Sequence, residues 1–397
     1  MLIVAVTGGI GSGKSTVSAA LGQLGAVIVD SDVLAREVVA PGTRGLAAVA
    51  EAFGAGVIDA RGALDRAELA RIVFSDPAAR GTLEGITHPL VRSRAAQIQR
   101  DAAADAVVVN DIPILTTLTV AATFHLVIGV RAAPDLRVAR LVGRGLAESD
   151  ARVRIAAQIG DDERAALCDV LLDNQGDREQ LVESAGSLWR SRIRPFADNA
   201  MARRRATGSG PRLVDPNPRW PIDARRLAAR ISRAAGGGRV DHIGSTAVPG
   251  MPAKDVIDLQ LTVPDLDAAD DLGPALTAAG FPLAVGFDRD NPHPAGADQQ
   301  QWRKRLHGSA DPGRSVNLHL RVGDSQGWRW ALLFRDWLTA DPQVAAEYLE
   351  LKRSVAAAHA SDPTAAGYAE AKEPWMALAY DRGLAWAATS GWQPAAG

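Results

Sequence analysis

The stretch LIVAVTGGIGSGKS, residues 2–15, decides the fold of the first half of the chain. A short apolar run leads into the pattern G-x-x-x-x-G-K-[ST], which Gly8, Gly13, Lys14 and Ser15 match in full. Glycines let the backbone curl so that several N–H groups point at one anion, and a following helix presents its positive end there. The stretch therefore predicts a cradle for nucleotide phosphates between a strand and a helix.

The predicted cradle consists of Gly8, Gly9, Ile10, Gly11, Ser12, Gly13, Lys14, Ser15 and Thr16. In this pattern the Lys14 ammonium reaches the β- and γ-phosphates, and the Ser15 hydroxyl can ligate Mg²⁺. The alternative is a glycine-rich turn without a ligand. The pattern predicts phosphate binding but leaves open whether the phosphate passes to water, to a small metabolite or to nothing.

Further short apolar runs favour a doubly wound α/β domain of the P-loop NTPase type that ends near residue 200. They are continuous rather than alternating, as expected for strands buried on both faces of a parallel sheet, and helical patterns separate them. The predicted strands are 2–7, 26–30, 106–110, 125–130 and 169–173.

Carboxylates follow two of these predicted strands, at the edge where open parallel sheets bind ligands. Asp30 and Asp32 follow the second, and Asp111 follows the third in the position of a Walker-B carboxylate. Such a group can take a proton from an attacking hydroxyl or hold Mg²⁺ through water. The alternative for each is a helix N-cap or turn, because aspartate is favoured there.

Arginines at helical spacing predict a lid over the phosphates. Arg137, Arg140 and Arg144 are expected to share one helix face, and Arg154 follows in the next helical stretch. Arginines on a closing lid can neutralise the charge of a moving phosphoryl group. The alternative for any one of them is a surface ion pair.

Residues 1–200 resemble the dephospho-coenzyme A kinase family as a set of motifs. The matching stretches include TGGIGSGKS (7–15), VDSDVLAREVV (29–39), GALDRAELARIVF (62–74), ITHPLV (86–91), ARLVGRGLAESDARVRIAAQ (139–158) and DVLLDN (169–174). The resemblance implies transfer of the γ-phosphate of ATP to the ribose 3′-hydroxyl of dephospho-coenzyme A, the last step of coenzyme A biosynthesis, with Mg²⁺ as cofactor.

The resemblance also assigns roles to residues. Asp32 would be the base on the hydroxyl, and Lys14 and Arg140 would stabilise the transferring group. Arg144 and Asn174 would contact ATP, with Asn174 near the adenine. The remaining assignments are His88 for the acceptor region, Arg154 for the lid, and Ser15 and Asp111 for Mg²⁺ through water.

One departure from the family pattern stands after the third strand. The family continues as P-L-L-x-E, whereas this chain has Pro113 to Thr117 without a glutamate, and Asn110 stands where an acid is frequent. Reduced activity is one expected consequence. The alternative function is therefore a P-loop nucleotide-binding regulatory protein whose kinase activity has lapsed.

Residues 201–215 are predicted to form a linker and 216–397 a second domain with a different core, because eight of nine tryptophans lie beyond residue 210. Strand patterns at 256–263 and 316–322 mix with helical patterns around 223–234, 327–340 and 342–358, which predicts an α+β fold. The stretch DHIGSTAVPGMPAKDVIDLQLTV (241–263) resembles the GrpB-like (UPF0157) family, distant relatives of nucleotidyltransferases. Its candidate site residues are Gly244, Ser245 and Asp258.

Two carboxylates at i and i+2 of a strand can share one metal, but Gln260 stands at i+2 from Asp258, and Asp255 is expected to face the other way. His242, Lys254 and His319 are candidates to complete a site. The domain is interpreted as a regulatory or stabilising module. The alternative is an active nucleotidyltransferase-like domain in a bifunctional protein.

Composition bounds the remaining possibilities. A net charge of −2 gives no electrostatic case for nucleic acid as a partner. Cys168 is the single cysteine, no apolar run reaches membrane-spanning length, and no signal peptide is apparent, so a cytoplasmic location is expected. The sequence gives no indication of oligomeric state.

Overall fold

A computed structural model describes residues 1–208 and 210–395 and divides into two compact units. Unit 1 comprises residues 1–115 and 126–187, and unit 2 comprises 116–125 and 188–397. Ser209, within the predicted linker 201–215, and the last two residues of the predicted second domain lie outside the described residues. The predicted domain limit at residue 200 stays a prediction.

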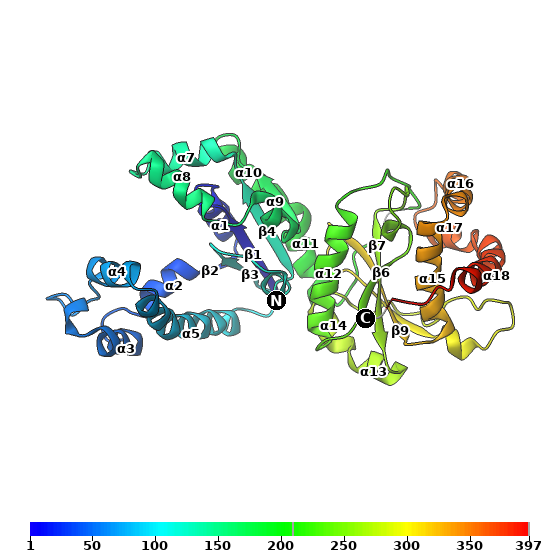
Figure 1. Cartoon of the computed structure of the whole chain (residues 1–397), viewed down its shortest axis with the longest axis horizontal. Coiled ribbons are helices and arrows are strands. Elements are labelled where there is room, and N and C mark those ends of the chain that lie inside the picture. Colours follow the sequence, from blue (N-terminus) through cyan, green and yellow to red (C-terminus); the bar gives the residue numbers. More distant parts are fainter. Residues whose placement is uncertain (209, 396–397) are drawn as a thin grey trace. The chain divides into compact units, whose positions relative to one another are not determined.

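Unit 1 is built on a five-stranded parallel sheet in the order β2-β3-β1-β4-β5, which confirms the predicted α/β class (Figure 1). Val4, Val6, Val108 and Ile128 are fully buried, as both-face coverage by helices requires. The strands are β1 (Leu2–Gly8), β2 (Val27–Asp30), β3 (Val107–Asp111), β4 (Leu126–Arg131) and β5 (Val170–Asp173).

The helices of unit 1 fall into three groups by position in the chain. The helices next to the sheet strands are α1 (Lys14–Gln23), α9 (Asp161–Ala166) and α10 (Arg178–Leu188). Those between β2 and β3 are α2 (Ser31–Glu37), α3 (Arg44–Phe53), α4 (Arg66–Ser75) and α5 (Pro77–Asp101), with a short 3-10 turn η1 (Ala55–Val57). A helical pair follows β4, α7 (Pro134–Val142) and α8 (Glu148–Ala156).

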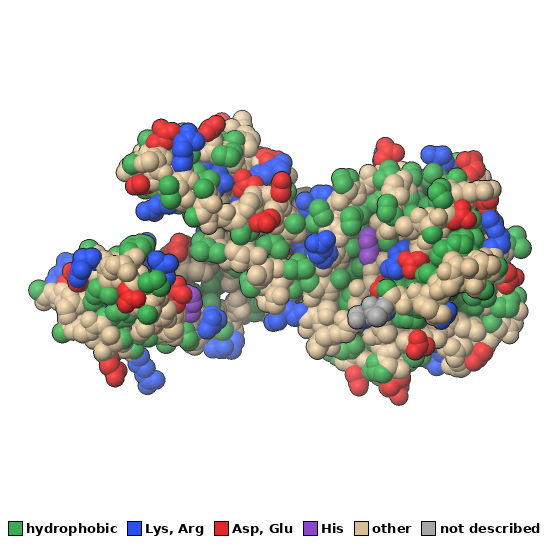
Figure 2. All heavy atoms as spheres, in the orientation of Figure 1, with side chains coloured by type: hydrophobic (Ala, Val, Ile, Leu, Met, Phe, Trp, Pro, Cys, Tyr) green, Lys and Arg blue, Asp and Glu red, His purple; other side chains and the backbone are tan. Residues whose placement is uncertain are grey.

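Two of these groups extend from the sheet as lobes with cores of their own. Helices α3 to α5 pack around Val49, Val57 and Leu69, and the α7–α8 pair packs around Val138 and Leu141. In Figure 1 the two lobes extend to either side of the edge where β1 meets α1. The space-filling view shows the surface hollowed between them, with charged side chains on both walls (Figure 2).

Unit 2 is α+β, as predicted, with a mixed four-stranded sheet in the order β6-β7-β9-β8. Strands β7 and β9 are parallel and the other neighbours antiparallel. The strands are β6 (Val240–Ile243), β7 (Val256–Val263), β8 (Lys304–Gly308) and β9 (Ser315–Val322).

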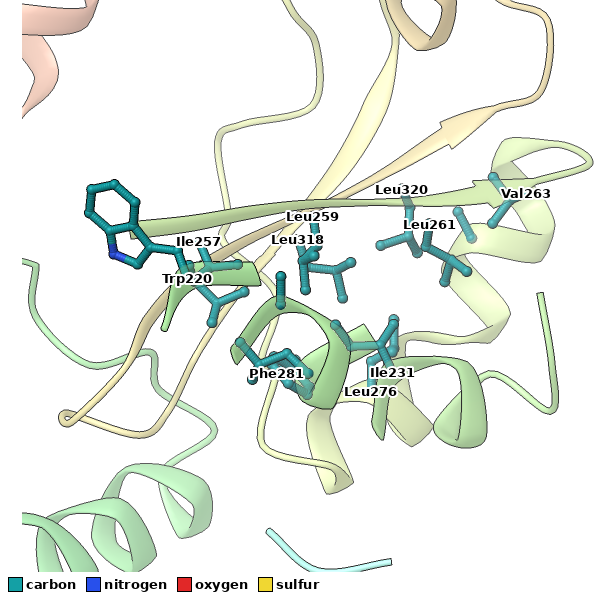
Figure 3. Packing of buried hydrophobic residues seen from close by; sticks show 14 of the residues in the cluster. Trp220, Ile231, Ile257, Leu259, Leu261, Val263, Leu276, Phe281, Leu318 and Leu320 are labelled. Atoms are coloured by element: carbon teal, nitrogen blue, oxygen red, sulfur yellow. The ribbon is translucent and has the colours of Figure 1, made fainter. Parts of the chain in front are cut away.

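One face of this sheet carries an aliphatic core. Leu259, Leu261, Leu318 and Leu320 are almost fully buried, and they pack against Ile231 and other residues of the covering helices (Figure 3). Those helices are α12 (Trp220–Ala234), α13 (Leu266–Asp271) and α14 (Gly273–Ala278).

The helices beyond the other face carry an aromatic core that includes Trp302, Trp330, Trp337 and Tyr380. They are α15 (Gln326–Ala340), α16 (Pro342–Ala358), α17 (Ala366–Glu370) and α18 (Glu373–Ser390). The remaining elements of unit 2 are α6 (Leu118–Ala121), the π-helical turn η2 (Trp189–Ile193), α11 (Arg194–Met201), and the 3-10 turns η3 (Ser245–Ala247) and η4 (Gln299–Trp302). Over the described part of the chain, no helix combines the length and apolarity needed to cross a bilayer.

Candidate functional site

The phosphate motif forms the loop between β1 and α1, with its glycines where the backbone demands them. Gly11 and Gly13 have φ of 79° and 103°, a region that favours glycine over residues with a Cβ. A Cβ on Gly9 would overlap the Arg137 guanidinium, and one on Gly13 would overlap the Asn174 amide. The loop therefore needs glycine for two reasons: Gly11 and Gly13 have positive φ, and Arg137 and Asn174 leave no room for a Cβ at Gly9 and Gly13.

Three side chains hold this loop in place. Arg137 donates through Nε to the Ile10 carbonyl at 2.9 Å, and Gln158 Oε1 accepts from the Ile10 N–H at 2.9 Å. Asn174, buried just after β5, donates through Nδ2 to the Ser12 carbonyl at 2.6 Å. These contacts fix the loop's shape before any nucleotide arrives, which is the pre-organisation that anion binding needs.

Arg137 differs from its predicted place on an exposed lid face. It is only 3% exposed, and it also pairs with Asp161 at 3.3 Å. Its helix neighbours Val138 and Leu141 are buried as well. The apolar spacing around Arg137 was the available signal that this arginine lies on the inner face of α7.

The other two arginines of the predicted face are separated by the end of the helix. Arg140 lies half-buried at the loop and donates to the Asn174 side-chain oxygen at 3.1 Å and to the Gly11 carbonyl at 3.4 Å. Helix α7 ends at Val142, so Arg144 is exposed in the turn before α8. The prediction that positions 137, 140 and 144 share one face is therefore wrong. Gly145, at φ of 92°, follows in the same turn.

Lys14 lies among three carboxylates at the carboxyl edge of the sheet. Its ammonium pairs with Asp111, which is buried at the end of β3 and accepts from the Ser18 hydroxyl at 2.8 Å. Burial lowers the pKa of Lys14, and the nearby charges of Asp32 and Asp30 oppose that shift. The first helix and the next two strands thus bring one cation and three anions together.

Asp30 and Asp32 have different roles in the fold. Asp30 is the N-cap of α2, since its carboxylate accepts from the N–H groups of Asp32 at 2.8 Å and Val33 at 3.1 Å. Asp32 is exposed in the first turn, and its carboxylate forms no hydrogen bond within residues 1–208 and 210–395. The N-cap alternative therefore holds for Asp30 and leaves Asp32 available.

In the described part of the chain, the side chains of the remaining predicted residues form no hydrogen bond or ion pair with the cluster around Lys14. His88 is exposed within α5, directly before Pro89, and Arg154 is exposed on α8. Ser15 and Thr16 follow Lys14 in the first turn of α1. Thr117, where the family pattern has glutamate, caps α6 by accepting from the Val120 N–H at 3.3 Å.

Sequence reasoning missed Gln158 and Ser18. Ser18 lies one turn after Lys14 on α1 and binds Asp111, so its i+4 spacing from Lys14 was a usable signal. Gln158 lies after the last turn of α8, and only its place at the end of the matched stretch 139–158 distinguishes it in the sequence.

Unit 2 brings its three predicted residues to one cavity of about 380 Å³. Gly244, at φ of 69°, opens the turn η3, and a Cβ there would come within 2.5 Å of the Asp258 carboxylate. Asp258 accepts from Asn317 Nδ2 at 2.9 Å, and His319 Nε2 lies 4.0 Å away. Ser245 also lines this cavity.

The neighbours of Asp258 do not resemble a metal site. Gln260 is fully buried and accepts from Arg321 at 2.7 Å, while Asp255, on the other face as predicted, accepts from Trp220 Nε1 at 2.7 Å. Burial lowers the pKa of both His242 and His319 to about 4. Across the described ranges, no group of three or more His, Cys, Asp or Glu side chains could hold a metal ion.

Comparisons with known proteins give two family matches. A family model described as dephospho-CoA kinase matches residues 2–180, and one described as GrpB protein matches residues 211–382. A dephospho-CoA kinase of Mycolicibacterium paratuberculosis is 49% identical over 410 residues, covering 99% of this chain and all of that protein.

Two further proteins match about half of the chain. A dephospho-CoA kinase of Streptomyces avermitilis is 49% identical over 190 residues, which cover 48% of this chain and 93% of that protein. The crystal structure of TT1252 from Thermus thermophilus shares 32% identity, with a TM-score of 0.40, and covers 48% of this chain and 96% of that chain.

Proposed function

The chain belongs to the dephospho-CoA kinase family, and from this premise we propose how unit 1 transfers the γ-phosphoryl group of ATP to the ribose 3′-hydroxyl of dephospho-CoA. The observation that carries the mechanism is the meeting of a braced phosphate loop, one lysine and one available aspartate at a single sheet edge. Phosphoryl transfer needs mainly positioning and charge neutralisation, which these groups supply.

The phosphates of ATP are held by the loop itself. The N–H groups of Lys14 and Ser15 belong to the first turn of α1, where they have no acceptor within the helix. They point with the helix dipole at the β- and γ-phosphates, and the Lys14 ammonium moves from Asp111 to the phosphate oxygens. Arg140, anchored on Asn174, adds a second cation as negative charge develops on the moving group.

Asp32 is the base in this proposal. Its carboxylate accepts the proton of the ribose 3′-hydroxyl as that oxygen forms its bond to the γ-phosphorus and the bond to ADP breaks. Asp30 supports this role because it caps α2 and so fixes the backbone from which Asp32 extends. The product carries the new phosphate, and Asp32 later returns its proton to water.

The oxygen donors at this edge fit Mg²⁺ when ATP is present. Ser15 offers a hydroxyl that forms no hydrogen bond within the described residues, and Asp111 offers a buried carboxylate nearby on β3. Such a pair holds Mg²⁺ only together with phosphate oxygens and water, as is usual for this ion. Bound there, Mg²⁺ would neutralise charge on the phosphates.

The two lobes complete the proposal. Arg144 and Arg154, on the α7–α8 lobe, would close over ATP, and His88, on α5, would contact the acceptor. Closure excludes water, which would otherwise take the phosphoryl group. ATP as co-substrate and a single buried cysteine favour a cytoplasmic location.

The proposal is tested by replacing Asp32 with its uncharged isostere. We expect Asp32→Asn to lower kcat for dephospho-CoA phosphorylation by about 10²–10⁴-fold, with the KM for ATP changing little. The matched control is Asp267→Asn, an exposed first-turn aspartate of α13 in unit 2. Full activity of Asp32→Asn would exclude Asp32 as the base.

A further inference from the structure

Three lysines line the cavity of unit 2 beside Asp258. Lys254 precedes β7, Lys352 lies on α16, and Lys372 is the residue before α18. Three separate parts of the chain thus bring their lysine side chains to one cavity. The aliphatic core on the opposite face of the sheet does not require lysines at these three positions.

These lysines are held by aromatic faces. The Lys254 ammonium lies 5.1 Å and the Lys372 ammonium 4.7 Å from the centre of the Tyr368 ring. The Lys352 ammonium lies 5.4 Å from the centre of the Tyr348 ring. Within residues 1–208 and 210–395, none of the three lysines forms an ion pair with a carboxylate.

Lys352 is the most constrained of the three. It is 2% exposed, and its ammonium donates to the Pro252 carbonyl at 2.6 Å. Burial and the charges of Lys372 and Lys254 lower its pKa to about 7, while Asp258 opposes the shift. A buried ammonium next to two others is unfavourable unless an anion joins them.

The carboxylates that line the cavity already have partners. Asp290 pairs with Lys304 and accepts from Arg321 Nε at 2.8 Å. Asp258 accepts from Asn317, and Glu373 lies 3.8 Å from His293. The lining carries four cations, Lys254, Arg321, Lys352 and Lys372, against these three carboxylates, and Lys304 adds a fifth cation at Asp290. The net charge around the cavity is therefore positive.

The rest of the cavity wall suits an organic body. Trp302, Trp330 and Phe334 supply apolar and aromatic surface, and Ser245 adds a hydroxyl that forms no hydrogen bond within the described residues. A volume of about 380 Å³ lies in the range of small-ligand sites. An anionic head and a compact, partly aromatic body would fill it together.

We propose that this cavity binds a small organic phosphate, with the phosphate against Lys254, Lys352 and Lys372 and the organic part against the aromatic wall. Binding needs no divalent cation, because the lysines supply the charge that a metal would otherwise supply. The site is separate from the kinase site and does not depend on the function proposed for unit 1.

The test is equilibrium dialysis of the full chain with phenyl phosphate in the presence of EDTA, with inorganic phosphate and phenol as partial ligands. We expect saturable binding of phenyl phosphate that exceeds the binding of either part. Lys14→Met, which disables the phosphate loop of unit 1, should retain saturable binding by unit 2. Lys254→Met/Lys372→Met should weaken it at least tenfold, since each lysine supplies a charge-assisted hydrogen bond.

A second readout protects the test against misfolding. All nine tryptophans lie in unit 2, so tryptophan fluorescence during heating reports its folding in each variant. If the double variant does not fold, Lys372→Gln alone takes its place. The proposal is overturned if phenyl phosphate does not bind in the millimolar range, if the lysine variants bind it equally, if Mg²⁺ is required, or if Lys14→Met abolishes binding.

Discussion

The phosphate loop of unit 1 and the lysine-lined cavity of unit 2 use the same elements differently. In each, a strand runs into a turn built on a positive-φ glycine, Gly13 in one and Gly244 in the other. Lys14 then lies among carboxylates, whereas Lys254 and Lys372 lie on aromatic rings. We propose that both sites attract a phosphate, and that the first also uses a carboxylate, Asp32, to take a proton.

This difference explains why we assign chemistry to one site and binding to the other. In our proposal, Asp111 pairs with the Lys14 ammonium until phosphate replaces it, and Asp32 remains available to an acceptor hydroxyl. In unit 2 the carboxylates are paired with cations or amides that belong to the fold. A cavity of this kind can retain an anion.

The largest expected effect comes from removing Lys14, the cation that distinguishes the phosphate loop by its carboxylate neighbours. We expect Lys14→Met to lower kcat/KM for dephospho-CoA phosphorylation by about 10³-fold or more, because transition-state charge loses its main partner. A coupled assay of ADP release measures it. The control is Arg225→Met, an exposed cation on α12. A loss of less than about tenfold would show that Lys14 does not touch the moving group.

Replacing Asn174 or Gln158, two of the side chains that hold the loop in place, should have a smaller effect on catalysis. The two replacements should differ in how they change kcat and KM. Asn174→Leu removes the contacts to both the Ser12 carbonyl and Arg140, whereas Gln158→Leu removes those to Ile10 and Arg137. We expect roughly 10–100-fold lower kcat/KM for Asn174→Leu, with kcat reduced as well as KM raised. Gln158→Leu should act mainly on KM. Equal kcat losses in the two variants would remove Arg140 from the catalytic role.

The sequence predicted the parts of unit 1 that depend on local pattern. Continuous β-branched runs located all five strands, and the glycine spacing located the loop, because these features depend on burial and on φ alone. Arg144 was misplaced, since helix spacing cannot show that α7 ends at Val142, whereas the apolar spacing around Arg137 could have placed that arginine on the inner face. The sequence also could not show which of Asp30 and Asp32 caps α2, because that depends on the residue at which the helix begins.

In unit 2 the sequence predicted the strand that bears Asp258 and named Lys254 as a candidate, but Lys352 and Lys372 could not be found from it. Lys254, Lys352 and Lys372 lie far apart in the chain and belong to no spacing pattern. They meet because Lys352 of α16 donates to the Pro252 carbonyl, and because the ring of Tyr368 on α17 lies against both Lys254 and Lys372. Only the tertiary packing of Tyr348 and Tyr368 brings the three ammonium groups together.

The smallest expected effect is that of Lys352→Met on the free energy of unfolding of unit 2. Lys352→Met removes a buried cation, and we expect it to stabilise unit 2 without ligand by about 1–3 kcal/mol. The lowered folded-state pKa, about 7 against 10.5, means that the unfolded chain binds more protons between these values. Wild-type stability should therefore rise relative to the variant as pH increases through this window.

Urea unfolding followed by tryptophan fluorescence at pH 6 and pH 9 measures this trend. The groups facing Lys352 are Lys254, Lys372, Asp258 and the two tyrosines, Tyr348 and Tyr368. His242 and His319, with pKa values of about 4, stay neutral throughout. A stability difference that is the same at both pH values would show that the pKa of Lys352 is not lowered in the folded protein.

The central claim is that the loop, Lys14 and Asp32 pass the γ-phosphoryl group to a ribose hydroxyl rather than to water. The most direct measurement is the ratio of ADP to phosphorylated product when the full chain turns over ATP and dephospho-CoA with Mg²⁺, with the product's new phosphate located by ³¹P NMR. We expect equal amounts of both, with the phosphate on the ribose 3′-oxygen. ADP without that product, or no turnover at all, would contradict the account.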